Sequence, residues 1–597
     1  MAGPPAGSTY YGLVGRLGLH WEIITEGTMK KRLFTTTLLT AAVLTLASCE
    51  KAATPAKPQA PFNVVEASIP DMQKAMAEGR VTAEELVKSY LVRIATYENV
   101  INATIAVNPN ALAEARALDA ERKAGKLRGP LHGIPVALKD NIQETTMPTT
   151  GGTLGLAGFM AAWDAPLAAN LKAGGAIIIA KTTMTELANY FGQGMPGNYS
   201  SYSGYSYNPY DPRRDMRAGQ NDGRPVMNTG GSSSGAGTAA SFWAVNVGSE
   251  TSGSILSPSN QNMLAGIKPT VGRISRHGII PITADQDTAG PMGRSVTDVA
   301  IMMGVLEGKQ PDPNDSATTR CAPPANNDHT SHLKADALKG ARIGVPRLGY
   351  GVVTTPPGLK ETRGEMPEDQ MKAFEEAIAV LKQAGAEIVD PADFPSYSAK
   401  EADKNPLSIG GCDRPGSEAS TACSAVLAYG MHRDFNAWLA AQNGKAPFKT
   451  LDELVAWNEA NKNLGTMKYT QNALLGALAN DLEKNKAKYE ADRKRDIELN
   501  GTQAIDAAMT EHKLDALLFA GARGAGVAAK PGYPTVIVPF AMVANPPTPA
   551  YPEGFNPQPM PMGISFTGMA CAEPRLIELA YAFEQLTKKR QPPPNMP

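Results

Sequence analysis

The chain has 597 residues, and its charges nearly cancel, with 57 lysines and arginines against 58 aspartates and glutamates. Nucleic-acid-binding domains usually carry a basic excess or stripe, so this balance argues against a nucleic-acid partner. The 42% hydrophobic content is typical of a globular protein with a sizeable core, and the 57 glycines and 47 prolines favour a loop-rich α/β enzyme over a helical bundle.

The N-terminal region predicts export. Residues 1–28 precede Met29, where we expect the translated protein to start. Residues 29–48 have the form of a secretory signal peptide, because the cationic run MKKR precedes an apolar stretch that is short for a membrane span. The sequence LASC ends at Cys49 and resembles a bacterial lipobox, which implies cleavage before Cys49 and diacylation of that cysteine. The alternative is an uncleaved membrane helix.

We therefore expect a lipid-anchored protein that faces the periplasm of a bacterial cell envelope and contacts the membrane through Cys49. Glu50 follows the cysteine where inner-membrane retention is associated with aspartate, which favours the outer membrane. Residues 49–65 supply the anchor and a Pro/Ala-rich linker. Residues 66–590 are expected to form the folded domain.

Beyond the linker, helical and strand patterns alternate along the chain. Residues 67–99 show helical spacing, with Thr82 and Glu85 placed as a capping box, and residues 110–125 predict another helix. Short apolar runs bounded by turn residues predict buried strands in IPVALKD, AIIIAK, ARIGVP, ALLFA and TVIVPF. This alternation predicts an α/β fold, a single large domain with a central mixed β-sheet covered by helices. Residues 308–336 and 547–563 are rich in Pro, Asn or Asp and predict surface loops.

Four cysteines follow Cys49. In an oxidising compartment, Cys412 and Cys423 could close a short loop as a disulfide, whereas Cys321 and Cys571 are expected to be isolated buried thiols. His329 and His332 have a spacing seen in metal sites, but no further ligand accompanies them in their polar loop. We expect a solvated histidine pair, no bound metal and no organic cofactor.

The residues with the clearest chemistry are a lysine and two serine-glycine tracts. Lys139 lies in the apolar run LHGIPVALKDNI, and burial there favours the neutral amine, which can act as a base. The tracts GGSSSG (230–235) and GSETSGSI (248–255) place serines on glycine-rich backbone whose N–H groups can bind an oxyanion. None of the seven histidines stands in a recognisable triad motif, so lysine is the candidate base for a serine nucleophile.

These tracts resemble the signature of the amidase signature family. AGIKPTVGRIS (265–275) and DTAGPMGRSVTD (287–298) follow them in the family's order, and the resemblance spans roughly residues 66–587. Within this family, the sequence is similar to peptide amidases and to the A subunit of glutamyl-tRNA amidotransferase. The resemblance implies the amidase signature fold and a Ser-cisSer-Lys triad of Lys139, Ser232 and Ser254, with a cis peptide bond between Gly231 and Ser232.

The resemblance also implies the role of each residue. Lys139 would take a proton from Ser232, which takes one from Ser254, and Ser254 would attack the carbonyl and hold the acyl group. The oxyanion hole and substrate-binding positions would be Thr251, Ser252, Gly253 and Ser233, with the N–H of Ser254.

The chain departs from the family pattern in three places. Ser252 stands where a second glycine is common, and Leu256 stands where an arginine is common. The tract between Ser232 and Ser254 is two residues shorter than usual, so the choice of Ser232 over Ser233 or Ser234 depends on the alignment.

We therefore expect hydrolysis of carbon–nitrogen amide bonds through an acyl-enzyme on Ser254, in small, peptide C-terminal or aryl-acyl amides. One alternative is an esterase or acyl-transferase with the same triad, and another is a catalytically silent envelope binding protein. Ser233 in a G-x-S-x-G elbow is a rival nucleophile, but that motif needs a preceding strand and the preceding segment is polar. An exported lipoprotein would not meet tRNA. Six tyrosines between residues 190 and 210 either border the substrate or pack on the domain.

Overall fold

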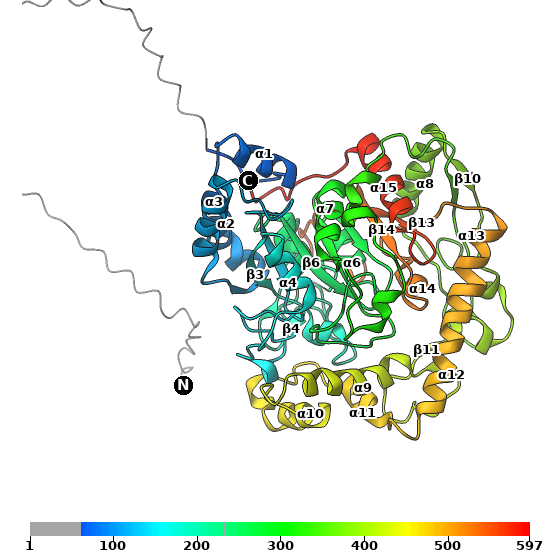
Figure 1. Cartoon of the computed structure of the whole chain (residues 1–597). Helices are drawn as coiled ribbons and strands as arrows, with labels where there is room; N and C mark the ends of the chain where they lie inside the picture. Colours follow the sequence, from blue (N-terminus) through cyan, green and yellow to red (C-terminus); the bar gives the residue numbers. More distant parts are fainter. Residues whose placement is uncertain (1–60, 232–233) are drawn as a thin grey trace, which may run out of the picture. The chain divides into compact units, whose positions relative to one another are not determined.

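A computed structural model describes residues 61–231 and 234–597, which belong to one compact unit. The predicted signal peptide, Cys49 and the linker up to residue 60 lie outside the described residues. The described part is built on a mixed sheet of eleven strands in the order β1–β3–β2–β6–β8–β7–β14–β15–β13–β9–β10 (Figure 1). Its strands are β1 (Thr104–Val107), β2 (Pro135–Lys139), β3 (Ile177–Thr182), β6 (Val245–Glu250), β7 (Ala265–Lys268), β8 (Thr288–Gly293), β9 (Arg342–Gly344), β10 (Glu387–Val389), β13 (Ala516–Ala520), β14 (Thr535–Val543) and β15 (Met560–Thr567).

Both pairing modes occur in this sheet, which confirms the predicted mixed character. Strand β2 runs parallel to β3 and β6, and β9 runs parallel to β10 and β13. The strands between these groups pair antiparallel, from β6 through β8, β7, β14 and β15 to β13. Strands β2, β3, β6 and β13 are buried along their whole length, as expected for continuous apolar runs covered on both faces.

The helices lie around the sheet, and the predicted capping box is present at the start of α2. The Thr82 side chain accepts from the Glu85 N–H, and the Glu85 carboxylate accepts from the Thr82 N–H. The longer helices are α1 (Ile69–Ala77), α2 (Ala83–Ile101), α3 (Ala111–Lys123), α4 (Pro166–Ala173), α7 (Val296–Leu306), α8 (Glu368–Gln383), α9 (Val426–Ala441), α10 (Leu451–Ala460), α11 (Asn472–Ala479), α12 (Lys486–Ile497) and α15 (Glu573–Thr587). Short helices are α5 (Ser234–Ala239), α6 (Leu256–Gln261), α13 (Ala507–Glu511) and α14 (Ala525–Ala529), and a π-helical stretch, Glu498–Asp506, joins α12 to α13.

Helices α9, α10 and α11 lie side by side at one edge of the domain and have an apolar core of their own (Figure 1). Tyr190 and Tyr199 are buried in this core. Tyr199, Tyr205 and Tyr469 pack ring against ring, with the Lys468 ammonium over their faces. Tyr190, Tyr199 and Tyr205, from the tyrosine-rich segment, therefore contribute to the packing of this core.

The last residues of the chain return to α2 (Figure 1). The guanidinium of Arg93, which is nearly buried, donates to the carbonyl oxygens of Pro597 at 2.7 Å and Met596 at 2.9 Å. Arg590 pairs with Glu66 at 2.7 Å. The two ends of the described domain are thus joined to each other.

Two loop predictions need correction. Residues 547–563 are a loop only as far as Pro559, because Met560 begins β15. Met560, Met562, Ile564 and Phe566 alternate along this strand and are all buried, a period that Pro559 and Pro561 obscure in the sequence. Residues 308–336 form three short 3₁₀ turns and contain buried side chains, so this segment is only partly a surface loop.

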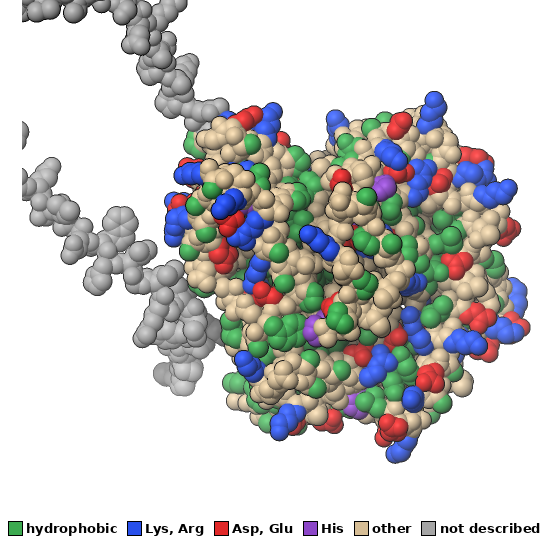
Figure 2. Space-filling model, viewed as in Figure 1, with side chains coloured by type: hydrophobic (Ala, Val, Ile, Leu, Met, Phe, Trp, Pro, Cys, Tyr) green, Lys and Arg blue, Asp and Glu red, His purple; other side chains and the backbone are tan. Residues whose placement is uncertain are grey.

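Charged side chains of both signs are interspersed over the face of the molecule shown in Figure 2. No helix in the described part of the chain is both long and apolar enough to span a bilayer.

Candidate active site

Lys139 is the last residue of β2, between β3 and β6, and its side chain is fully buried. Burial lowers the pKa of its ammonium to about 8, although the carboxylates of Asp287 and Glu250 partly offset that effect. The next residue, Asp140, forms a buried ion pair with Lys181 at 3.2 Å. The predicted burial of Lys139 is therefore confirmed, and burial lowers the pKa of its amine, which is the direction that makes a neutral form more accessible.

Ser249 of β6 holds the amine of Lys139 in place. The Nζ atom donates to the Ser249 carbonyl oxygen at 3.1 Å and to its Oγ at 3.2 Å. Asn141 Nδ2 donates to the same Oγ at 2.9 Å. A neutral amine has two N–H bonds and one lone pair, so these contacts use its protons and leave the lone pair for another neighbour. The sequence did not reveal Ser249 or Asn141 as partners in this hydrogen-bond network, although Ser249 lies inside the serine-glycine tract 248–255.

Ser254 lies in the turn between β6 and α6 and is half-buried. Gly253 has φ +106°, a conformation that side chains rarely adopt. No described residue accepts a hydrogen bond from the backbone N–H groups of Ser252, Gly253 and Ser254. Three adjacent N–H groups at this turn are the donors that an oxyanion requires.

Two carboxylates hold this turn. The Glu250 carboxylate accepts from the N–H groups of Ile255 at 2.8 Å and Leu256 at 2.9 Å. The Thr251 hydroxyl donates to Asp287, which also accepts from two backbone N–H groups. Burial raises the pKa of Asp287 to about 7. Sequence reasoning missed both carboxylates, because their acceptor role depends on contacts between separate segments.

Ser232 and Ser233 lie outside the described residues, as does the predicted cis bond between Gly231 and Ser232. The residues just before them are described. The Thr185 hydroxyl donates to the Gly231 carbonyl oxygen at 3.0 Å. Gly230 packs so closely on the backbone of Pro258 in α6 that a Cβ atom would not fit. The serine tract at 230–235 therefore begins against the helix that follows Ser254.

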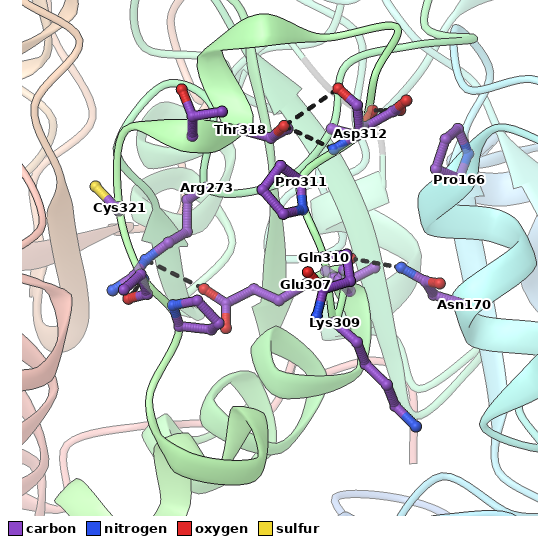
Figure 3. A pocket seen from close by; sticks show the side chains of 16 residues that line it. Pro166, Asn170, Arg273, Glu307, Lys309, Gln310, Pro311, Asp312, Thr318 and Cys321 are labelled. Carbon is purple, nitrogen blue, oxygen red and sulfur yellow. Dashed lines mark hydrogen bonds and ion pairs between the residues drawn. The ribbon is translucent and has the colours of Figure 1, made fainter.

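A cavity of about 520 Å³ lies elsewhere (Figure 3). Neither Lys139 nor residues 251–254 line it. Arg273 and Glu307 form a buried ion pair in its wall at 3.1 Å, and Glu307 also contacts His329 Nε2 at 2.9 Å. The expectation of a solvated histidine pair is wrong for His329, which is fully buried because Glu307 supplies its partner. No group of side chains suited to a metal ion is found among the described residues.

All four described cysteines form disulfides. The predicted bond between Cys412 and Cys423 is confirmed. The expectation of isolated thiols is wrong, because Cys321 is bonded to Cys571, 250 residues away. Such a pairing depends on the tertiary fold and cannot be read from cysteine spacing.

Comparison with known proteins identifies the family of the chain. The family described as Amidase matches residues 85–577. A protein of Arabidopsis thaliana named "Probable amidase" is 32% identical over 540 residues, which is 89% of this chain and 92% of that protein. The native peptide amidase of Stenotrophomonas maltophilia superposes with a TM-score of 0.74 at 33% identity, covering 89% of this chain and 99% of that one. An amidase family protein of Bacillus anthracis gives a TM-score of 0.73 at 31% identity, over 89% and 92% of the two chains.

Proposed function

The chain belongs to the amidase family and is an amide hydrolase, and from that premise we propose that it acts through an acyl-enzyme on Ser254, activated by Lys139 and Ser232. The observation that carries this proposal is the buried amine of Lys139, which is held by Ser249 on the strand that leads into Ser254. A buried lysine with a lowered pKa is a competent general base near neutral pH.

In the proposed reaction, Ser254 Oγ forms a bond to the amide carbon while its proton passes to Ser232 and the Ser232 proton passes to Lys139. The backbone N–H groups of residues 252–254 stabilise the oxyanion. The carbon–nitrogen bond then breaks, and Lys139 returns the proton through Ser232 to the departing amine. Water adds to the acyl carbon by the same proton route, which releases the acid and restores the hydroxyl of Ser254.

We propose small amides, peptide C-terminal amides or aryl-acyl amides as substrates. The likeness to a peptide amidase over nearly the whole of both chains supports this class. An esterase with the same groups would form the same acyl-enzyme, so matched amide and ester substrates distinguish the two activities. An acyl-transferase would pass its acyl group to added hydroxylamine in preference to water.

We also propose that the protein is exported and anchored through Cys49. Two disulfides within the described residues support an oxidising compartment, because such bonds are rare in the cytosol. A Cys49→Ser variant should lose its lipid label and move from the membrane fraction to the soluble fraction. Unchanged membrane association with no lipid label would contradict this anchor.

A fluorophosphonate probe followed by peptide mass spectrometry tests the nucleophile. The protein comprising residues 50–597 should carry a single probe adduct, on Ser254. An adduct on Ser233 would instead assign the elbow mechanism. Absence of any adduct, together with no turnover of an amide library, would favour the silent binding protein.

A further inference from the structure

A second cavity, about 290 Å³, lies beside α6. Its lining residues come from α6, α8, the end of β13 and the loop after it, and the start of β15. The polar side chains that line it are Ser257, Asn260, Gln261, Gln370 and Arg523. Met560 and Met562 form an apolar wall.

This cavity adjoins the turn that carries Ser254. Ser257 lines the cavity, and its N–H donates to the Gly253 carbonyl oxygen at 2.6 Å. Ala522 lines it as well and packs on the small cluster of Leu256, Ala525 and Ile537. A Cβ atom on Gly253 would lie 3.8 Å from that of Ala525. The loop containing Arg523 therefore packs against the loop containing the proposed nucleophile.

Arg523 is a half-buried cation without a countercharge in the described part of the chain. Its guanidinium donates to the Glu365 carbonyl oxygen at 2.9 Å and to Gln370 Oε1 at 3.3 Å, and both acceptors are neutral. No described carboxylate lies within ion-pair distance of it. Burial lowers the pKa of Arg523, and no neighbouring charge offsets that effect. Guanidinium nevertheless stays protonated, so the cavity carries a positive charge.

Another cavity adjoins the one beside α6, and the two share Gln261 and Met560 in their walls. Its arginines differ from Arg523 because each is paired with a carboxylate. Arg217 in its wall pairs with Asp215 at 2.6 Å, and Arg224 pairs with Asp222 at 2.8 Å. The unpaired charge is thus particular to Arg523 among the arginines of these two cavities.

We propose that this cavity binds a carboxylate carried by the amide substrate, with Arg523 as the countercharge. The proposal rests on the amide hydrolysis proposed for Ser254 and narrows its substrates to amides that also bear an acidic group. A carboxylate can accept two parallel N–H bonds from guanidinium, and the polar side chains of α6 and α8 can supply further donors. The methionines would pack against the apolar carbons between the acid and the amide.

Matched substrate pairs test this assignment. The substrates are short peptide amides with glutamate placed one, two or three residues before the scissile amide, each paired with its glutamine isostere. At one position or more, the purified protein should show a kcat/KM about 10- to 100-fold higher for the glutamate member, the range expected of a charge-assisted hydrogen bond. Arg523→Gln should reduce this ratio to near one, and Arg523→Lys should retain part of it.

Arg214→Gln is the control, because Arg214 is exposed and lines neither cavity. Its replacement removes the same positive charge as Arg523→Gln. This variant should keep the wild-type ratio. A wild-type ratio of one or less at every position would overturn the proposal, and so would a preference that survives in Arg523→Gln. Fluorophosphonate labelling of Ser254 should be unchanged in every variant. A wild-type protein that shows neither fluorophosphonate labelling of Ser254 nor turnover of any amide would instead refute the proposed hydrolase mechanism.

Discussion

The rate of amide hydrolysis should follow the protonation of Lys139. At pH 7, an amine with its ordinary pKa of 10.5 would be neutral in roughly 0.03% of molecules, whereas a pKa of about 8 makes roughly 9% neutral. Burial thus increases the fraction of competent base by roughly 300-fold. Because the neutral form is the active one in the proposed mechanism, kcat/KM should rise about tenfold per pH unit up to about pH 8 and then level off.

The assay is the pH dependence of kcat/KM between pH 5.5 and 9.5, with the rate of fluorophosphonate labelling as a second readout. Asp287→Asn should move the inflection to lower pH, because the carboxylate of Asp287 raises the pKa of Lys139 in the wild-type protein and the variant lacks it. Asp285→Asn removes the same charge from a group that pairs with Arg433 and Arg493, and should leave the inflection in place. A rate that is flat from pH 6 to 9, or an inflection unmoved in Asp287→Asn, would refute lysine as the base.

Three further results are expected. Ser254→Ala should abolish acyl-enzyme formation and Lys139→Ala should lower kcat about 10²–10⁴-fold, with unchanged circular dichroism; near-wild-type turnover in either would exclude its role. Cys571→Ser should destabilise the fold by about 5 kcal/mol and Cys423→Ser by about 3 kcal/mol, since the first bond closes the longer loop; equal melting temperatures would contradict this order. Asp140→Asn should cost about 3–5 kcal/mol in denaturant unfolding, because its buried lysine partner loses its charge neighbour; a loss below about 1 kcal/mol would show that the pair is dispensable.

Local patterns in the sequence predicted the elements but not their partners. The capping box at Thr82 and the apolar run that ends at Lys139 are encoded by neighbouring residues, and both were found where expected. The order of the eleven strands depends on long-range pairing that no local pattern encodes. Met560 was placed in a loop because nearby prolines mask the alternation of its strand.

The same distinction applies to the site. Burial of Lys139 followed from its apolar neighbours, but its acceptor, Ser249, lies 110 residues away on β6. Glu307 lies within hydrogen-bond distance of the buried His329, and Cys571 bonds to a cysteine 250 residues earlier. These contacts arise only when distant segments pack together, so residue type and spacing could not reveal them.

The contacts of Arg93 connect three separate segments of the domain. Its guanidinium, on α2, donates to Met596 and Pro597 and also to the Ala240 carbonyl oxygen at 2.8 Å. Removal of residues 596 and 597 would leave part of a nearly buried cation without acceptors. The integrity of α2 therefore depends on the C-terminal segment that packs against it.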